Sequence, residues 1–395
     1  MRLPYLLLTL LLVFNVFIDV YIYKCISSAG RGKTWRRVQL WSAVLFALLF
    51  ISVLVMPVRS ATNSMLVGVM WMIFVYGSVY VSKFVFVAFD ALSRLPRLFK
   101  RGQWRWLSMT GLGISVITFL CMWWGALVTR LSLDTVDVTY TDCNLPAGLD
   151  GFRIAQISDI HLSTYDGDTA FVHKLVEHIN SLDADIVVFT GDMVSRNSDE
   201  AEAYVAPLSR LHARYGVYSV LGNHDYGDYE DWPSAAAKAK DHSRLIELQR
   251  RMGWRLLRDE TARIPVNGDT LVLIGVENIG RPPFKAYGNL RRAYETPGDN
   301  RFKVLLSHDP SHWEKEIKDN PENNINLTLS GHTHAMQMEF FGMSPASAVH
   351  KYWSGMYTDK YGKGLYVNIG TGTVGYPARM GSARPEITLI TLKRG

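Results

Sequence analysis

Seven candidate ligands for divalent cations stand in five short motifs. The motifs are Ser-Asp-Ile-His at 158–161, Thr-Gly-Asp at 190–192, Gly-Asn-His-Asp at 222–225, Ser-His-Asp at 307–309 and Gly-His-Thr-His at 331–334. They supply carboxylate, amide and imidazole groups and no thiolate, a combination that favours Mn, Fe or Zn. Seven such groups exceed what one ion needs, so the sequence predicts a site for two divalent cations. The candidate ligands are Asp159, His161, Asp192, Asn223, His308, His332 and His334.

Two cations held close together favour the hydrolysis of phosphoesters, because they bind the phosphate oxygens and lower the pKa of a bridging water. We expect Asp192, in the middle of the set, to be the carboxylate that both ions share. The resulting hydroxide would attack phosphorus in line. His224 is the spare imidazole beside a ligand and suits the general acid that protonates the leaving oxygen. We expect Asp225 to orient that imidazole.

Short β-branched runs, each predicted to be a strand, precede these motifs. Ligand sites in open α/β sheets lie beyond the carboxyl ends of the strands, so the motifs can meet at one place. Amphipathic stretches at 169–182, 201–214 and 234–251 are predicted to be helices, and this alternation indicates an α/β domain. The predicted strands are 152–157, 185–189, 218–221, 271–276, 302–306, 325–329, 364–369 and 387–392.

The five motifs, in this order, resemble the signature of the calcineurin-like metallophosphoesterases. A second matching region runs from Tyr366-Val367-Asn368-Ile369-Gly370 through Arg379 and Pro385 to Glu386–Leu389, and it is similar to the membrane-anchored bacterial branch of that family. The resemblance covers about 150–393 and implies a four-layer αββα sandwich with a dimetal centre between its sheets. One departure follows the last motif, where relatives often have Gly-Gly-Gln and this chain has Ala335-Met336-Gln337.

The same resemblance implies a role for each matching residue. It places Asp159, His161, Asp192 and His334 around one metal and makes His224 the catalytic histidine. Around the other metal it places Asp192, Asn223, His308 and His332.

Charge is unevenly distributed along the 395 residues. Residues 1–130 hold 14 Lys and Arg against two acidic residues, whereas residues 131–395 hold 28 basic and 34 acidic residues and all 11 histidines. The formal net charge of +6 therefore combines two parts of opposite sign. This distribution argues against a basic nucleic-acid-binding protein. We expect a transmembrane region at 1–130 and a catalytic domain at 131–395.

Four apolar runs, at about 4–23, 38–57, 64–90 and 107–129, each have the roughly 20 residues that a membrane-spanning helix needs. The first run lacks a small-x-small cleavage site before Ile22, which argues against a signal peptide. Loops 24–37 and 91–106 each carry five Lys or Arg, whereas the connection 58–63 carries only Arg59. The basic loops belong on the cytoplasmic side, which predicts an extracytoplasmic catalytic domain at the inner (plasma) membrane.

Three intramembrane charges fall in these runs: Asp19, Lys83 and Asp90. Intramembrane charges are candidates for function. We favour a structural role, in which snorkelling or a Lys83–Asp19 pair stabilises them.

The expected activity is a membrane-anchored, dimetal-dependent phosphoester hydrolase acting on a phosphorylated lipid or lipid-linked substrate, with Mn favoured. Alternatives are a nucleotide-linked diacylglucosamine pyrophosphatase or a broad phosphodiesterase, and, in another class, a non-catalytic metal-binding sensor or scaffold. The retained His224 argues against a scaffold. A transporter with a regulatory domain is disfavoured because broken-helix Gly/Pro pairs are missing from the sequence.

Two further features bear on the substrate. Arg379 and Arg281 are candidates for binding the phosphate or head group. The segment 335–363 interleaves lysines with aromatic residues and is either a lid at the lipid interface or a satellite core under a long loop. Its residues of interest are Phe340, Phe341, Lys351, Tyr352, Trp353, Tyr357, Lys360, Tyr361 and Lys363.

Overall fold

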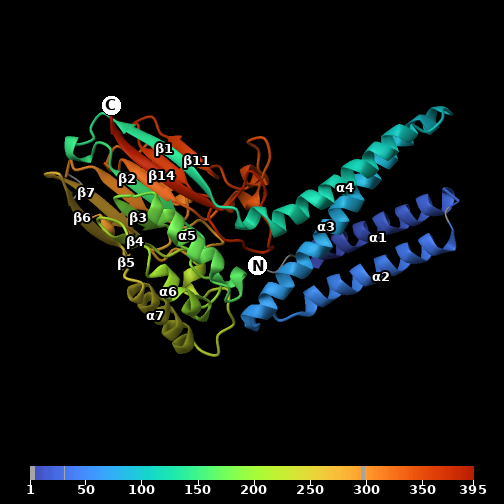
Figure 1. Cartoon of the computed structure of the whole chain (residues 1–395), viewed down its shortest axis with the longest axis horizontal. Helices are drawn as coiled ribbons and strands as arrows, with labels where there is room; N and C mark the ends of the chain where they lie inside the picture. Colours follow the sequence, from blue (N-terminus) through green and yellow to red (C-terminus); the bar gives the residue numbers. More distant parts are fainter. Residues whose placement is uncertain (1–4, 31, 295–298) are drawn as a thin grey trace. The chain divides into compact units, whose positions relative to one another are not determined.

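The computed structural model describes residues 5–30, 32–294 and 299–395 (Figure 1). The chain divides into two compact units. The first lies within residues 1–58 and 68–126, and the second comprises 59–67 and 127–395. The short segment 59–67, which comprises the end of the connection after the second long helix and the first residues of the third, therefore belongs to the same unit as the C-terminal part of the chain.

The first unit consists of four long helices, each apolar and long enough to cross a membrane. This confirms the four apolar runs predicted from the sequence, except that residue 4 lies outside the described residues. The third helix is longer than its predicted run, because it continues through the polar residues on both sides. The helices are α1 Tyr5–Ser28, α2 Lys33–Val55, α3 Asn63–Ser93 and α4 Arg105–Leu127.

The intramembrane charges are paired within this unit. Nζ of Lys83 lies 2.7 Å from Oδ1 of Asp19, and the Tyr80 hydroxyl donates to Oδ2 of Asp19 over 2.6 Å. Nε of Arg94 lies 2.7 Å from Oδ2 of Asp90. The Lys83–Asp19 pair expected from the sequence is thus present, and these contacts favour a structural role for the charges.

The second unit contains two six-stranded sheets and a small pair, β10 with β13. The first sheet has the order β1-β14-β2-β3-β4-β5, and the second has the order β11-β12-β9-β8-β7-β6. Neighbouring strands are parallel except β14 with β2, β6 with β7 and β11 with β12. The strands are β1 Asp134–Asp142, β2 Arg153–Ile157, β3 Ile186–Phe189, β4 Val217–Ser219, β5 Arg255–Leu256, β6 Glu260–Val266, β7 Asp269–Gly275, β8 Lys303–Leu306, β9 Leu327–Ser330, β10 Met338–Glu339, β11 Gly355–Thr358, β12 Gly364–Val367, β13 Met380–Gly381 and β14 Glu386–Arg394.

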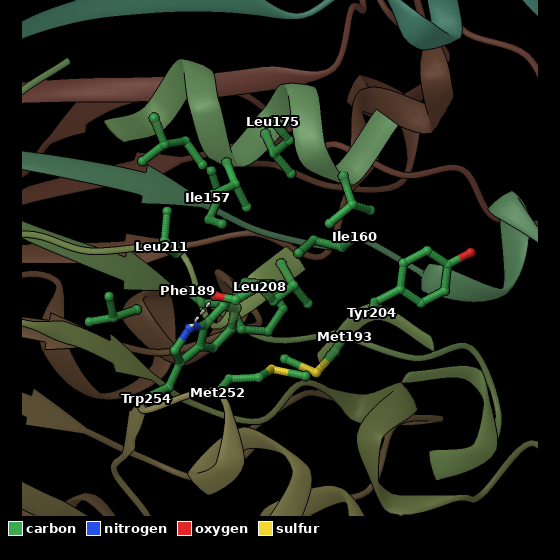
Figure 2. Packing of buried hydrophobic residues seen from close by; sticks show 14 of the residues in the cluster. Ile157, Ile160, Leu175, Phe189, Met193, Tyr204, Leu208, Leu211, Met252 and Trp254 are labelled. Carbon is green, nitrogen blue, oxygen red and sulfur yellow. Dashed lines mark hydrogen bonds between the residues drawn. The ribbon is translucent and has the colours of Figure 1, made fainter. Parts of the chain in front are cut away.

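Three hydrophobic clusters arrange this unit in four layers. Helices α5 Ala170–Ser181, α6 Val205–Leu208 and α7 Ala235–Arg251 pack on the outer face of the first sheet (Figures 1 and 2). A second cluster fills the space between the sheets. The third lies on the outer face of the second sheet, under α8 Leu290–Ala293 and the π-helical turn Trp313–Ile317. The order helix, sheet, sheet, helix confirms the predicted αββα sandwich.

The largest local error of the sequence prediction concerns the helix expected at 201–214. The structure has a 3₁₀ segment at Ser198–Tyr204 and then the single turn α6, Val205–Leu208. Pro207 explains the difference, because proline is tolerated in the first turn of an α-helix and not in its interior. Strand β1 was not predicted, although it pairs with β14 over nine residues.

Candidate metal centre

The five motifs converge because the strands before them end at the same edges. In the first sheet, β2, β3 and β4 end at Ile157, Phe189 and Ser219, and in the second, β8 and β9 end at Leu306 and Ser330. Backbone hydrogen bonds join the motifs laterally in each sheet, 159 to 191 over 2.9 Å and 331 to 308 over 2.9 Å. Both sheets therefore contribute ligands to one site.

The backbone around the site is tightly constrained. Five of the seven candidate ligands adopt left-handed φ angles between 46° and 75°, namely Asp159, His161, Asp192, His332 and His334. Such conformations cost about 1–3 kcal/mol each and cluster at functional sites. A Cβ atom at Gly222 or Gly331 would collide with the carboxylate of Asp192 or Asp159, respectively. These glycines therefore let the backbone approach the carboxylates closely.

The first group of donor atoms surrounds His161 and His334. Nε2 of His334 lies 3.2 Å from Oδ1 of Asp159 and 3.1 Å from Nε2 of His161. Nε2 of His161 is in turn 3.7 Å from Oδ2 of Asp192. These four residues are the ones that the family resemblance places around one metal.

The second group shares the same oxygen of Asp192. Its Oδ2 lies 3.1 Å from Nε2 of His308. That nitrogen is 3.2 Å from Oδ1 of Asn223 and 3.3 Å from Nδ1 of His332. Asp192 thus faces both groups, as expected of a carboxylate shared by two ions.

The chemistry of the two groups fits divalent cations. In each group the imidazole, carboxylate and amide atoms lie 3.1–3.7 Å from a neighbouring one, the kind of N and O donor set that binds divalent cations. Burial disfavours a charged imidazole, yet the carboxylates of Asp192 and Asp159 raise the pKa of His308 to about 10. Burial also opposes ionisation of Asp192, but the charge of His308 holds the pKa of its carboxyl well below the ordinary value. The site favours positive charge, which two divalent cations would supply.

His224 lies beside both groups and is held in one orientation. Its Nδ1 lies 2.7 Å from the carbonyl oxygen of Ser195. Because a carbonyl only accepts, Nδ1 carries a hydrogen and Nε2 is the nitrogen that can exchange a proton. The backbone N–H of His224 donates to Oδ1 of Asp192 over 2.8 Å.

The structure corrects the position predicted for Asp225, because its carboxylate accepts from backbone N–H groups and not from the His224 imidazole. Oδ2 accepts from the N–H groups of Gly222 and Asp192, and Oδ1 from those of Met193 and Val194, over 2.9–3.2 Å. Asp225 therefore joins the second and third motifs, and the Ser195 carbonyl orients His224.

Tyr229 is a neighbour of the centre that the sequence did not reveal. Its ring stacks on His224 with centroids 4.0 Å apart and planes 15° apart. Its hydroxyl accepts a hydrogen bond of 2.8 Å from Nδ2 of Asn223, so Oδ1 of Asn223 faces the second group. Burial raises the pKa of Tyr229 to about 12, so the hydroxyl stays protonated near neutral pH.

The two arginines considered for phosphate binding occupy different environments. Arg379 is fully buried and donates to the carbonyl groups of Ile369 and Gly372, with Nη2 3.5 Å from Nδ1 of His334. Arg379 therefore lies next to the candidate metal ligand His334, on the side of its Nδ1 atom. Arg281 instead lines a cavity of about 200 Å³, and its Nη2 donates to the carbonyl oxygen of Val349 over 2.7 Å.

The segment 335–363 has a buried part and an exposed part. Tyr352 is buried and meets the rings of Trp313 and Tyr357 at centroid distances of 5.1 and 5.0 Å, as in a satellite core. By contrast, Phe340 is 44% exposed and Phe341 is 96% exposed. Their turn, closed by reciprocal backbone hydrogen bonds between residues 340 and 343, presents apolar side chains to the surroundings.

Comparison with known proteins agrees with this geometry. Residues 152–336 match a family model described as calcineurin-like phosphoesterase, and residues 1–130 match one described as probable calcineurin-like phosphoesterase, transmembrane domain. A metallophosphoesterase of Bacillus subtilis, YkuE, is 32% identical over 270 residues, which cover 66% of this chain and 86% of that protein. The chain belongs to the calcineurin-like phosphoesterases. Membership indicates a membrane-associated hydrolase of phosphoester bonds that uses divalent metal ions.

Two other relatives are also similar to this chain. A transmembrane protein with metallophosphoesterase domain from Bos taurus is 31% identical over 259 residues, 63% of this chain. The chain spans about half, 54%, of that protein's length. The UDP-2,3-diacylglucosamine pyrophosphatase LpxG of Chlamydia trachomatis is 27% identical over 311 residues, covering 66% of this chain and 90% of that protein.

Proposed function

We propose that this phosphoesterase hydrolyses a phosphorylated lipid or lipid-linked substrate at the outer face of the membrane. The observation that supports hydrolase activity is the position of His224, which is held beside two groups of donor atoms that share Asp192. We assign Asp159, His161, Asp192 and His334 to one cation and Asp192, Asn223, His308 and His332 to the other. When bound, two divalent cations, with Mn favoured, would supply the positive charge that polarises the phosphoester and activates water.

Residues of the protein then supply and orient the proton that the leaving oxygen needs. The Ser195 carbonyl fixes Nδ1 of His224, so Nε2 delivers the proton to the leaving oxygen. Asp225 keeps the motif loops together through its four backbone contacts. Arg281, in its cavity, is the candidate for binding a substrate head group.

Three observations support a lipid substrate at the outer face. The turn at 340–343 exposes Phe341 almost completely, and aromatic side chains are favoured at the lipid interface. The connection 59–67 belongs to the catalytic unit, which supports placing both on one side of the membrane. The loops at 24–37 and 91–106 are rich in Lys and Arg, which favours a cytoplasmic position for them, on the side opposite to the catalytic unit.

A second candidate is a nucleotide-linked diacylglucosamine pyrophosphatase, supported by the similarity to LpxG. The full chain in nanodiscs with Mn²⁺ should release phosphate from phosphatidic acid vesicles. Release of UMP from UDP-2,3-diacylglucosamine, without phosphate release from the vesicles, would favour the second candidate. A reporter fused at the C-terminus should be active outside the cytoplasm, and a cytoplasmic result would exclude our substrate assignment.

A further inference from the structure

Segment 59–64, which comprises the end of the connection after helix α2 and the first two residues of α3, packs against the loops that hold His224. The N–H of Asp231 donates to the carbonyl oxygen of Arg59 over 2.9 Å. Nε of Arg59 lies 2.7 Å from Oδ1 of Asp231. Its Nη2 donates to the carbonyl oxygens of Asp228 and Glu230 over 3.0 and 3.3 Å. One guanidinium therefore binds residues on both sides of Tyr229 in the sequence.

The same segment contacts a second loop that orients His224. Nη1 of Arg196 donates to the carbonyl oxygen of Ala61 over 2.9 Å and lies 3.5 Å from the Glu230 carboxylate. Arg196 directly follows Ser195, whose carbonyl fixes Nδ1 of His224. Both groups that orient the imidazole, the Ser195 carbonyl and the Tyr229 ring, are thus within one or two residues of contacts made by segment 59–64.

A third contact reaches the loop after the first motif. Nδ2 of Asn63 donates to the carbonyl oxygen of Ser163 over 3.2 Å, and the Ser64 hydroxyl donates to Oδ1 of Asp166 over 3.0 Å. His161 lies two residues before Ser163, and its ring meets the His224 ring edge to face at 4.9 Å. Segment 59–64 therefore contacts the three loops that carry Ser195, Tyr229 and His161, the neighbours of the His224 ring described above.

We propose that the connection 59–64 is a positioning element of the active site, in which Arg59 holds Tyr229 against His224. This inference rests on the proposed role of His224 as the general acid. Arg59 is 43% and Asp231 62% exposed in their side chains, and exposed ion pairs contribute little stability. The contact is therefore suited to orienting a loop more than to stabilising the fold.

The test compares two substrates with the full chain in nanodiscs at saturating Mn²⁺. The leaving group of 4-nitrophenyl phosphate needs no proton, whereas that of ethyl phosphate does. Arg59→Ala should lower kcat for ethyl phosphate by about 10- to 100-fold more than for 4-nitrophenyl phosphate, as expected for a displaced general acid. KM, bound Mn²⁺ and Tm should change little.

Matched variants make the result decisive. Arg59→Lys keeps the charge but cannot bind a carboxylate and two carbonyls with one planar group, so its loss should be smaller and equally selective. It also serves if Arg59→Ala fails to fold. Arg250→Ala, which removes an exposed arginine paired with Glu247 at 2.7 Å, should behave as wild type. An equal loss for both esters in the Arg59 variants, or no loss, would overturn the positioning role.

His224→Ala separates this inference from the proposed function. It should show the same selectivity for ethyl phosphate, with a larger effect. If it is not selective, the general-acid assignment itself fails. If His224→Ala is selective and the Arg59 variants are not, the inference alone fails.

Discussion

The ring of Tyr229 lies flat on the imidazole of His224, with centroids 4.0 Å apart, while its hydroxyl binds Asn223 at 2.8 Å. One side chain thus supports both the predicted proton donor and a predicted metal ligand. The two roles can be separated by substitution, because the ring makes the first contact and the oxygen makes the second.

Tyr229→Phe should weaken Mn²⁺ binding by about tenfold and leave kcat at saturating metal close to wild type, because it removes only the bond to Asn223. Tyr229→Ala should also lower kcat, since His224 loses its stacking partner. Mn²⁺ titration calorimetry and steady-state kinetics measure the two effects. An unchanged affinity in Tyr229→Phe would show that the hydroxyl does not support the Asn223 ligand.

His224→Ala should reduce kcat by about 10²–10⁴-fold while the protein keeps its metal, because the ring is a proton donor and not one of the proposed ligands. Metal analysis of the purified protein and assays with an alkyl phosphoester test this. His212→Ala, at an exposed histidine outside the site, is the control. Loss of metal in His224→Ala would make it a ligand.

Asp192→Asn should abolish both metal binding and hydrolysis, because the carboxylate faces both donor groups. Wild-type protein should show a rise in Tm when Mn²⁺ is added after chelation, and the variant should not. Asp199→Asn, in a side chain that is 78% exposed, should retain the rise. Full activity of Asp192→Asn would refute the dimetal assignment.

Glu200 should make stability depend on pH. Burial raises its pKa from the ordinary 4.5 to about 7. The folded protein therefore binds this proton more tightly than the unfolded chain, so its contribution is complete below pH 4.5 and is lost as pH rises through 7.

In Glu200→Gln the amide oxygen can still accept from the Ser195 N–H, which now donates to Glu200 over 2.5 Å. The Tm of this variant relative to wild type should increase between pH 5 and pH 8 in chelated protein. The exposed Glu322→Gln serves as the control. A constant difference in Tm would contradict the raised pKa.

Met336→Gly should raise the free energy of unfolding by about 1 kcal/mol, because Met336 has a φ of 46°, which glycine adopts without strain. Its side chain is 44% exposed, so little packing is lost. Met343→Gly, at an exposed methionine without a left-handed φ, should not stabilise. Thermal unfolding in detergent compares the two, and equal changes would exclude strain as the cause.

The sequence predicted the parts of the molecule in which residue type alone decides the outcome. Long apolar runs became α1–α4, and the β-branched runs before the five motifs became strands whose ends bring Asp159, Asp192 and His308 together. Parallel strands end at a common edge, so motif order was sufficient to predict which residues converge.

The remaining features depend on contacts that carry no pattern in the sequence. Any residue at position 195 offers the carbonyl that binds His224, so its type gives no signal. Tyr229 lies in a loop without periodicity, and its contact with His224 appears only in three dimensions. Asp225 was expected to orient the imidazole of His224, its neighbour in sequence. Its carboxylate instead accepts hydrogen bonds from backbone N–H groups, including those of Met193 and Gly222.

The position of β14 between β1 and β2 sets the order in which this protein can be completed. During synthesis the four helices and every candidate metal ligand leave the ribosome before Glu386–Arg394 does. Until that strand arrives, β1 has no partner among the described strands and one edge of β2 stays open. The first sheet therefore stays incomplete until β14 has been synthesised, and during this interval its unpaired strand edges are exposed to aggregation and proteolysis.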